Sequence, residues 1–157
     1  MKRTAALLAL FLFALVAASA VAAPPTASLQ INHLVRGCHS WSLNGGPYHV
    51  NQVVHLARGG SLRVTNDDLM VQDLAETKGP QVQMALVRQS HMGSMRMTMP
   101  MEGKPSPYAM AHMGAQVIVT FPTAGTYHFR LIDRGDYVAN IHTVGPDNKP
   151  TLTVIIN

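Results

Sequence analysis

Apolar and polar residues alternate along many short stretches of this chain, which is the pattern expected of half-buried β-strands. The alternation predicts strands near residues 29–34, 53–56, 62–66, 81–88, 116–121, 126–129 and 151–156. Turn sequences separate them, and Arg-Gly-Gly at 58–60 predicts a hairpin between the second and third of these strands. Short strands divided by turns about every ten residues predict an all-β fold, an antiparallel Greek-key β-sandwich.

One segment, residues 91–113, departs from this pattern and is called here the methionine-rich segment. It holds seven of the ten methionines and two of the eight histidines. Four methionines occupy alternate positions (Met95, Met97, Met99 and Met101), so an extended backbone would set four thioethers on one face. Its prolines and glycines exclude a helix. We therefore expect one long Met-rich loop between two strands.

The first 22 residues have the pattern of a secretory signal peptide. Lys2 and Arg3 precede an apolar run at 7–16, and small residues then lead to Ala-Val-Ala at 20–22, which fits a cleavage site. Residues 1–22 are thus expected to be removed, leaving a single domain at 23–157. The mature protein is predicted to be periplasmic or extracellular and not inserted in the membrane.

Composition narrows the classes of function. The chain has 12 Lys plus Arg against 8 Asp plus Glu and no cluster of basic residues, so nucleic acid is not an expected partner. Cys38 is the only cysteine, which excludes an internal disulfide but leaves burial, metal binding or an intermolecular disulfide open. No carboxylate pair lies with a base or nucleophile that would make a hydrolase, and no enzymatic activity is predicted.

Thioethers and imidazoles are the ligands that select Cu(I), and Glu102 is the one carboxylate of the methionine-rich segment. Methionine also serves as apolar filler, but residues 89–116 contain no Leu, Ile, Val or Phe for it to pack among. The pattern predicts a site for Cu(I) rather than Cu(II), with silver as another soft ion that would fit. The candidate ligands are Cys38, His39, His91, Met92, Met95, Met97, Met99, Met101, His112 and Met113, with Met110 beside them.

Several stretches together resemble a cupredoxin-like domain of a secreted bacterial subgroup. They are Gly37–Ser42, Leu62–Asp68, Phe121–Phe129, Ala111–Ala115 and the tail around 136–137, 143–145 and 152–154. The resemblance implies a β-sandwich and a copper-related function. Blue-copper members carry a histidine a few residues after the Asn-x-Asp turn, a position that looks like Gln72 here. They also carry a cysteine after the Gly-Thr-Tyr strand, where this chain continues with Arg130–Asp133.

A type 1 copper site needs a thiolate, two imidazoles and a weak axial sulfur. The site is therefore lost or rebuilt around Cys38, with imidazoles from His39, His112 or His142 and sulfur from Met70 or Met113. Adjacent strand residues point to opposite faces, so Cys38 and His39 would share an ion only where the backbone bends, as the preceding glycine permits.

These observations favour a secreted copper-binding protein that holds Cu(I) for tolerance or delivery, with a copper transporter or a redox protein as partner. Two alternatives stay open: a metal-free interaction domain whose methionines form an adaptable contact surface, and an electron-transfer protein with the rebuilt site. Trp41 is expected in the core. Single histidines on strands are expected at the surface or at edges (His33, His49, His55 and His128).

Overall fold

The computed structural model describes residues 26–34, 38–68, 70–88, 104, 106–133 and 149–157. The expected leader at 1–22 and the four alternating methionines lie outside these residues. Ten strands form in the described part, and none of its helices is long and apolar enough to cross a membrane.

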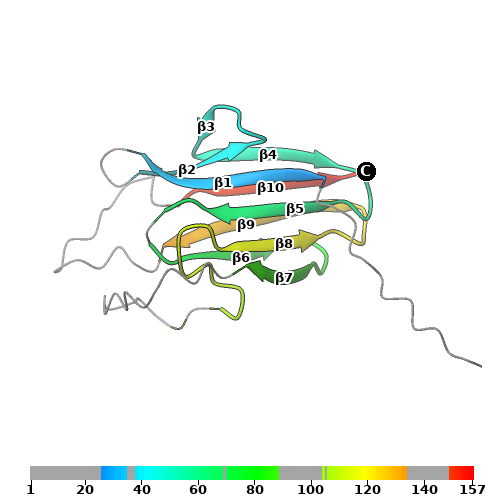
Figure 1. The fold of residues 1–157 in the computed structure, drawn as a ribbon. Helices are drawn as coiled ribbons and strands as arrows, with labels where there is room; N and C mark the ends of the chain where they lie inside the picture. Colours follow the sequence, from blue (N-terminus) through cyan, green and yellow to red (C-terminus); the bar gives the residue numbers. More distant parts are fainter. Residues whose placement is uncertain (1–25, 35–37, 69, 89–103, 105, 134–148) are drawn as a thin grey trace, which may run out of the picture.

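The strands form two sheets that face each other (Figure 1). The first sheet has six strands in the order β3 (Tyr48–His49), β2 (Cys38–Leu43), β1 (Ala27–Leu34), β5 (Ser61–Asn66), β8 (Gln116–Thr120) and β7 (Gln83–Arg88). The second has four strands in the order β4 (Asn51–Leu56), β10 (Thr151–Ile156), β9 (Gly125–Asp133) and β6 (Gln72–Lys78).

The expected all-β sandwich is confirmed, but its sheets are mixed rather than purely antiparallel. β1 runs parallel to β5, and β10 runs parallel to β4, whereas the other neighbours are antiparallel. The expected hairpin at 58–60 is wrong, because β4 and β5 belong to different sheets. The tight turn carries the chain across the sandwich, and each strand then pairs with a partner distant in sequence.

Alternate residues of both sheets point inward and form the core. Leu62 and Val64 of β5 are fully buried, and so is Trp41 of β2, as expected. The rings of Phe121 and Tyr127 pack edge to face with centroids 4.9 Å apart. This arrangement is the favoured one for aromatic pairs and fixes the turn between β8 and β9 against the core.

Replacing Leu62 by alanine should lower the free energy of unfolding by about 2–5 kcal/mol, because a fully buried leucine leaves a cavity. Val53, which is 50% exposed on β4, is the matched control, and Val53→Ala should change it by less than about 0.5 kcal/mol. Urea denaturation measures both. Equal losses for the two variants would contradict the assignment of the core.

Candidate polar clamp and metal-binding end

One end of the sandwich holds the backbone positions of those predicted ligands that the structure describes. Parallel pairing places the last residues of β1 and β5 at the same end, and β8 begins there opposite β5. β7 ends there beside β8, and β6 begins opposite the last residue of β9. This end, at the left in Figure 1, is called here the loop end. Both described flanks of the methionine-rich segment, Arg88 of β7 and the stretch 106–115 before β8, lie at the loop end.

Asn66, the last residue of β5, is fully buried and organises the loop end. Its Nδ2 donates to the carbonyl oxygens of Met70 at 2.7 Å and Met110 at 3.1 Å. Its Oδ1 accepts from the backbone N–H of Asp68 at 3.0 Å. One carboxamide thus holds both the turn that leads to β6 and the returning arm of the methionine-rich segment.

Met110 joins this arm to the second sheet. Its N–H donates to the carbonyl oxygen of Gln72 at 2.8 Å, and the N–H of Gln72 donates back at 3.1 Å. Both side chains are fully buried, and Met110 belongs to the hydrophobic core. Met110 therefore anchors the segment, and its thioether is not on the surface.

A second attachment lies four residues earlier along the same arm. Ser106 donates to Asp73 of β6 twice, from its N–H to Oδ2 at 2.9 Å and from its hydroxyl to Oδ1 at 2.5 Å. The Ser106 hydroxyl also accepts from the N–H of Tyr108 at 3.2 Å. Asp73 of β6 is therefore the fixed point of this arm.

His112 and Met113 are the predicted ligands that the structure describes in full. They lie in a turn closed by a bond from the N–H of Ala115 to the carbonyl oxygen of His112 at 2.9 Å. Gly114 follows with φ 80° and donates to the carbonyl oxygen of Asn66 at 2.6 Å. Both side chains are exposed, Met113 by 39%. The turn is pinned to the sandwich while an imidazole and a thioether face outward.

Cys38 and His39 begin β2 at the loop end. β1 and β2 pair without a register shift from Leu29 opposite Leu43 to Leu34 opposite Cys38. Successive positions of such a strand alternate between the faces of the sheet. The register sets the backbone of Cys38 opposite Leu34 and that of His39 opposite His33.

The other predicted ligands are His91, Met92, Met95, Met97, Met99 and Met101, and these lie outside the described residues. The same holds for His142. Met70 is half-buried, and its N–H donates to Asp68 Oδ1 at 3.4 Å. The structure therefore brings His112, Met113 and the start of β2 to one end, and it leaves the alternating methionines untested.

The described residues do not fit a type 1 copper site. At the position that resembles the first copper histidine stands Gln72, whose Nε2 donates to Asp68 Oδ2 at 3.3 Å. Its Oε1 is buried and has no hydrogen-bond partner. In the part of the chain that the structure covers, no three His, Cys, Asp or Glu side chains come together to hold a metal ion.

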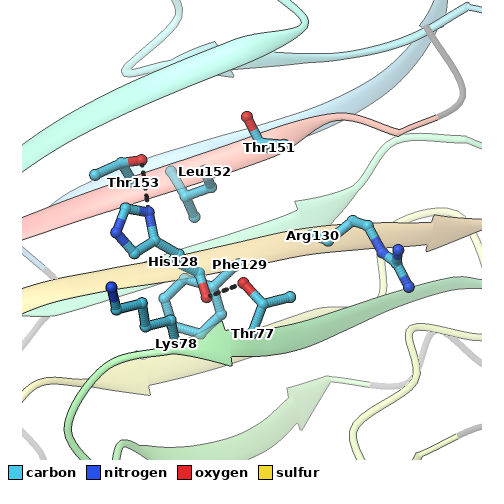
Figure 2. Close-up of a pocket in the computed structure, with 8 residues that line it drawn as sticks. All are labelled: Thr77, Lys78, His128, Phe129, Arg130, Thr151, Leu152 and Thr153. Carbon is cyan, nitrogen blue, oxygen red and sulfur yellow. Dashed lines mark hydrogen bonds between the residues drawn. The ribbon is translucent and has the colours of Figure 1, made fainter. Parts of the chain in front are cut away.

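An open hollow of about 470 Å³ lies on the outer face of the second sheet, between β6, β9 and β10 (Figure 2). Its one imidazole, His128, is half-buried, and Nδ1 lies 3.3 Å from the hydroxyl oxygen of Thr153. Lys78 and Arg130 extend in opposite directions from it. Nearby, burial raises the pKa of the Glu76 carboxyl. The lining has no thiol, thioether or carboxylate, so the hollow offers no soft-metal chemistry.

No protein-family model matches the chain, and no curated protein is similar to it in sequence. Among solved structures, the chain is similar to rusticyanin from Thiobacillus ferrooxidans, with 14% identity, a TM-score of 0.34, and coverage of 83% of this chain and 75% of that one. It is also similar to the multicopper oxidase McoA from Aquifex aeolicus, with 11% identity, a TM-score of 0.40, and coverage of 83% and 28%.

A third similar structure is the cysteine protease inhibitor EhICP2 from Entamoeba histolytica, with 11% identity and a TM-score of 0.38. It covers 71% of this chain and 100% of that one. Proteins of different activities thus have a comparable likeness to this sandwich. The likeness therefore assigns the chain to none of their families.

Asn66→Ala should lower the free energy of unfolding by about 2–4 kcal/mol, because it removes the bonds of Asn66 with the Met70 carbonyl oxygen and the Asp68 N–H and one of the two bonds that the Met110 carbonyl oxygen accepts. The control is Asn32→Ala, which removes a single exposed bond of 3.3 Å to the Tyr48 hydroxyl and should cost less than about 1 kcal/mol. Chemical denaturation gives both values, and native-state hydrogen exchange should show faster exchange at the Met110 amide. A loss no greater than that of the control would mean that Asn66 does not organise the loop end.

Proposed function

We propose that this protein is secreted and binds Cu(I) through its methionine-rich segment, holding the ion for tolerance or for delivery to a partner. The proposed ligands in the segment are the alternating thioethers with the residues that flank them. They are His91, Met92, Met95, Met97, Met99, Met101, His112 and Met113. Silver, as Ag(I), is a second soft ion that the same donors suit.

The observation that carries the proposal is the exposed turn of His112 and Met113 on a firmly attached arm. Bonds from Asn66 and Gln72 fix the backbone on either side of this turn. Fixing a ligand-bearing chain before the ion arrives reduces the conformational entropy lost on binding. A thioether and an imidazole are thus presented at the end of the sandwich where the described returning arm of the methionine-rich segment lies.

The chemistry of the donors favours Cu(I) in an exported protein. A thioether has no proton to lose, so methionine binds a soft cation at a pH that would protonate a thiol or an imidazole. Hard cations prefer carboxylates, of which the segment has one. The protein would pass its ion to a copper transporter or to a redox protein with similar donors.

Replacing Met95, Met97, Met99 and Met101 together by leucine should lower Cu(I) affinity by at least about tenfold, which equals about 1.4 kcal/mol. Leucine keeps the apolar volume but removes the sulfur. Anaerobic competition against a chromogenic Cu(I) chelator and copper content per chain measure the effect. The Cys38→Ser variant should bind as the parent does, because the thiol is not required by this site.

The same four methionines replaced by serine separate metal binding from an apolar contact surface. Loss of copper in both the leucine and the serine variants supports the sulfur site. Copper uptake equal to that of the parent in the leucine variant would refute it. Partner binding that survives leucine but not serine would instead identify the metal-free interaction domain.

Export is tested by the N-terminus of the protein recovered from outside the cytoplasm. Cleavage after the Ala-Val-Ala sequence at 20–22 should leave Ala23 as the first residue. Mass spectrometry of the intact secreted protein gives this directly. A chain that keeps residues 1–22 in that compartment would contradict the expected processing.

A further inference from the structure

We infer that the open hollow on the outer face of the second sheet binds an oligosaccharide of uronic acids, a chain of sugars that carries carboxylates and hydroxyl groups. This site uses neither a metal ion nor the methionine-rich segment, so it is separate from the proposed function. The inference rests on the charges of the hollow, on a β-bulge that places two of its side chains, and on the hydrogen bonds that its threonines make.

The hollow carries positive charge that no carboxylate in its lining balances. His128 of β9 is the cross-strand partner of Lys78 of β6, and Arg130 follows two residues further along β9. Strand positions two apart share a face of the sheet and lie about 6.5–7 Å apart along it. Glu76, the nearest carboxylate along β6, is paired instead with Phe129, whose side chain is buried in the core. The charge of the hollow is therefore available to an anionic ligand.

A β-bulge shapes the β6 side of the hollow. The register between β6 and β9 shifts between Glu76 and Lys78, so Thr77 is the extra residue beside the pair of Lys78 and His128. A bulge bends its strand and can re-aim a side chain, and bulges are common next to functional sites. Thr77 and Lys78 are both exposed and both line the hollow. The bulge thus brings a hydroxyl and an ammonium group to one place.

The two cations are too differently directed to bind one small anion together. Figure 2 shows the Lys78 and Arg130 side chains extending in opposite directions from the hollow of about 470 Å³. An ammonium attracts a carboxylate as a point charge, and a guanidinium can hold a carboxylate by two parallel hydrogen bonds. A ligand with two separated carboxylates can therefore contact both residues, whereas a single small ion contacts one of them.

Two threonines of the hollow are left as hydrogen-bond acceptors. The Thr77 hydroxyl donates to the carbonyl oxygen of His128 at 3.1 Å, and the Thr151 hydroxyl donates to Asn51 Oδ1 at 2.7 Å. A hydroxyl has one proton and two lone pairs, so both oxygens can still accept. Inorganic sulfate has no proton to donate to them. Sugar hydroxyls can donate to these oxygens while the carboxylates of the same ligand accept from the two cations.

Other anionic polymers match the hollow less well. The side chains of Phe129 and Leu152 are buried in the core, so the lining offers no exposed aromatic or large aliphatic side chain. Protein partners rely on such anchors at the centre of an interface, and single-stranded nucleic acids rely on aromatic side chains that stack on their bases. A hydroxylated polyanion needs neither, so a uronic acid chain is the favoured occupant.

The test is a titration of the mature chain with a trimer of galacturonic acid, with a chelator present and amide chemical shifts as the readout. The shifts should concentrate at residues that line the hollow. Replacing Lys78 and Arg130 together by glutamine should weaken binding by at least about tenfold. The matched control replaces Arg58 and Lys104, two exposed cations outside the hollow, by glutamine and should stay within about twofold.

A second pair of variants tests the acceptor role of the threonines. Thr151→Val keeps the shape of the side chain but removes the oxygen, and it should weaken binding by about threefold. Thr126→Val changes an exposed threonine of β9 outside the hollow and should leave binding unchanged. All the substituted side chains are exposed, so each variant should keep the melting temperature of the parent.

A neutral glucose trimer should not bind, and binding of the uronic acid trimer should weaken as salt is raised, because exposed charges are screened. The inference is overturned if the uronic acid trimer leaves the amide shifts unchanged, if the neutral trimer binds as tightly, or if either control loses as much as the variant it matches. Tighter binding of a glutamate peptide or a single-stranded oligonucleotide of equal charge would also overturn it, since the hollow would then serve a different polymer.

Discussion

The Asn66 carboxamide is the interaction on which the loop end depends. It sits where β5 ends, and its three bonds hold the turn toward β6 and the returning arm of the methionine-rich segment. Met110 then passes the connection to Gln72 in the other sheet. Because a buried polar group must be paired, these bonds are obligatory rather than incidental. Hydrogen bonds between polar groups therefore connect the two sheets at the loop end, whereas aromatic and aliphatic side chains pack between the sheets in the middle of the sandwich.

This division explains why the fold can carry a polar, ligand-rich end without losing its core. The inward row of β5 is apolar and fully buried up to Val64, and the buried polar residue Asn66 stands one step beyond it. Burial of apolar surface supplies most of the stability. The buried Oε1 of Gln72 has no hydrogen-bond partner, which costs free energy. The fold tolerates this cost because apolar burial elsewhere supplies the stability.

Much of the fold could be predicted from local alternation, and the failures involve contacts between residues distant in the sequence. β8, β9 and β10 alternate strongly, since one face of each is buried, and they were predicted near their observed positions. β6 was not predicted, because its first residues are polar and yet buried, with Gln72 and Asp73 serving the attachments of the arm. The hairpin between β4 and β5 was predicted wrongly, because a tight turn encodes a reversal of direction but not the sheet that the next strand joins.

The candidate site also depends on contacts between residues that are distant in the sequence. Met110 lies in the sequence among methionines that are predicted ligands, yet its side chain belongs to the hydrophobic core. Its two backbone bonds with Gln72, a residue distant in the sequence, show that it anchors the segment. Composition thus points to soft donors, whereas the bonds that fix Met110 join residues distant in the sequence, and composition does not reveal them.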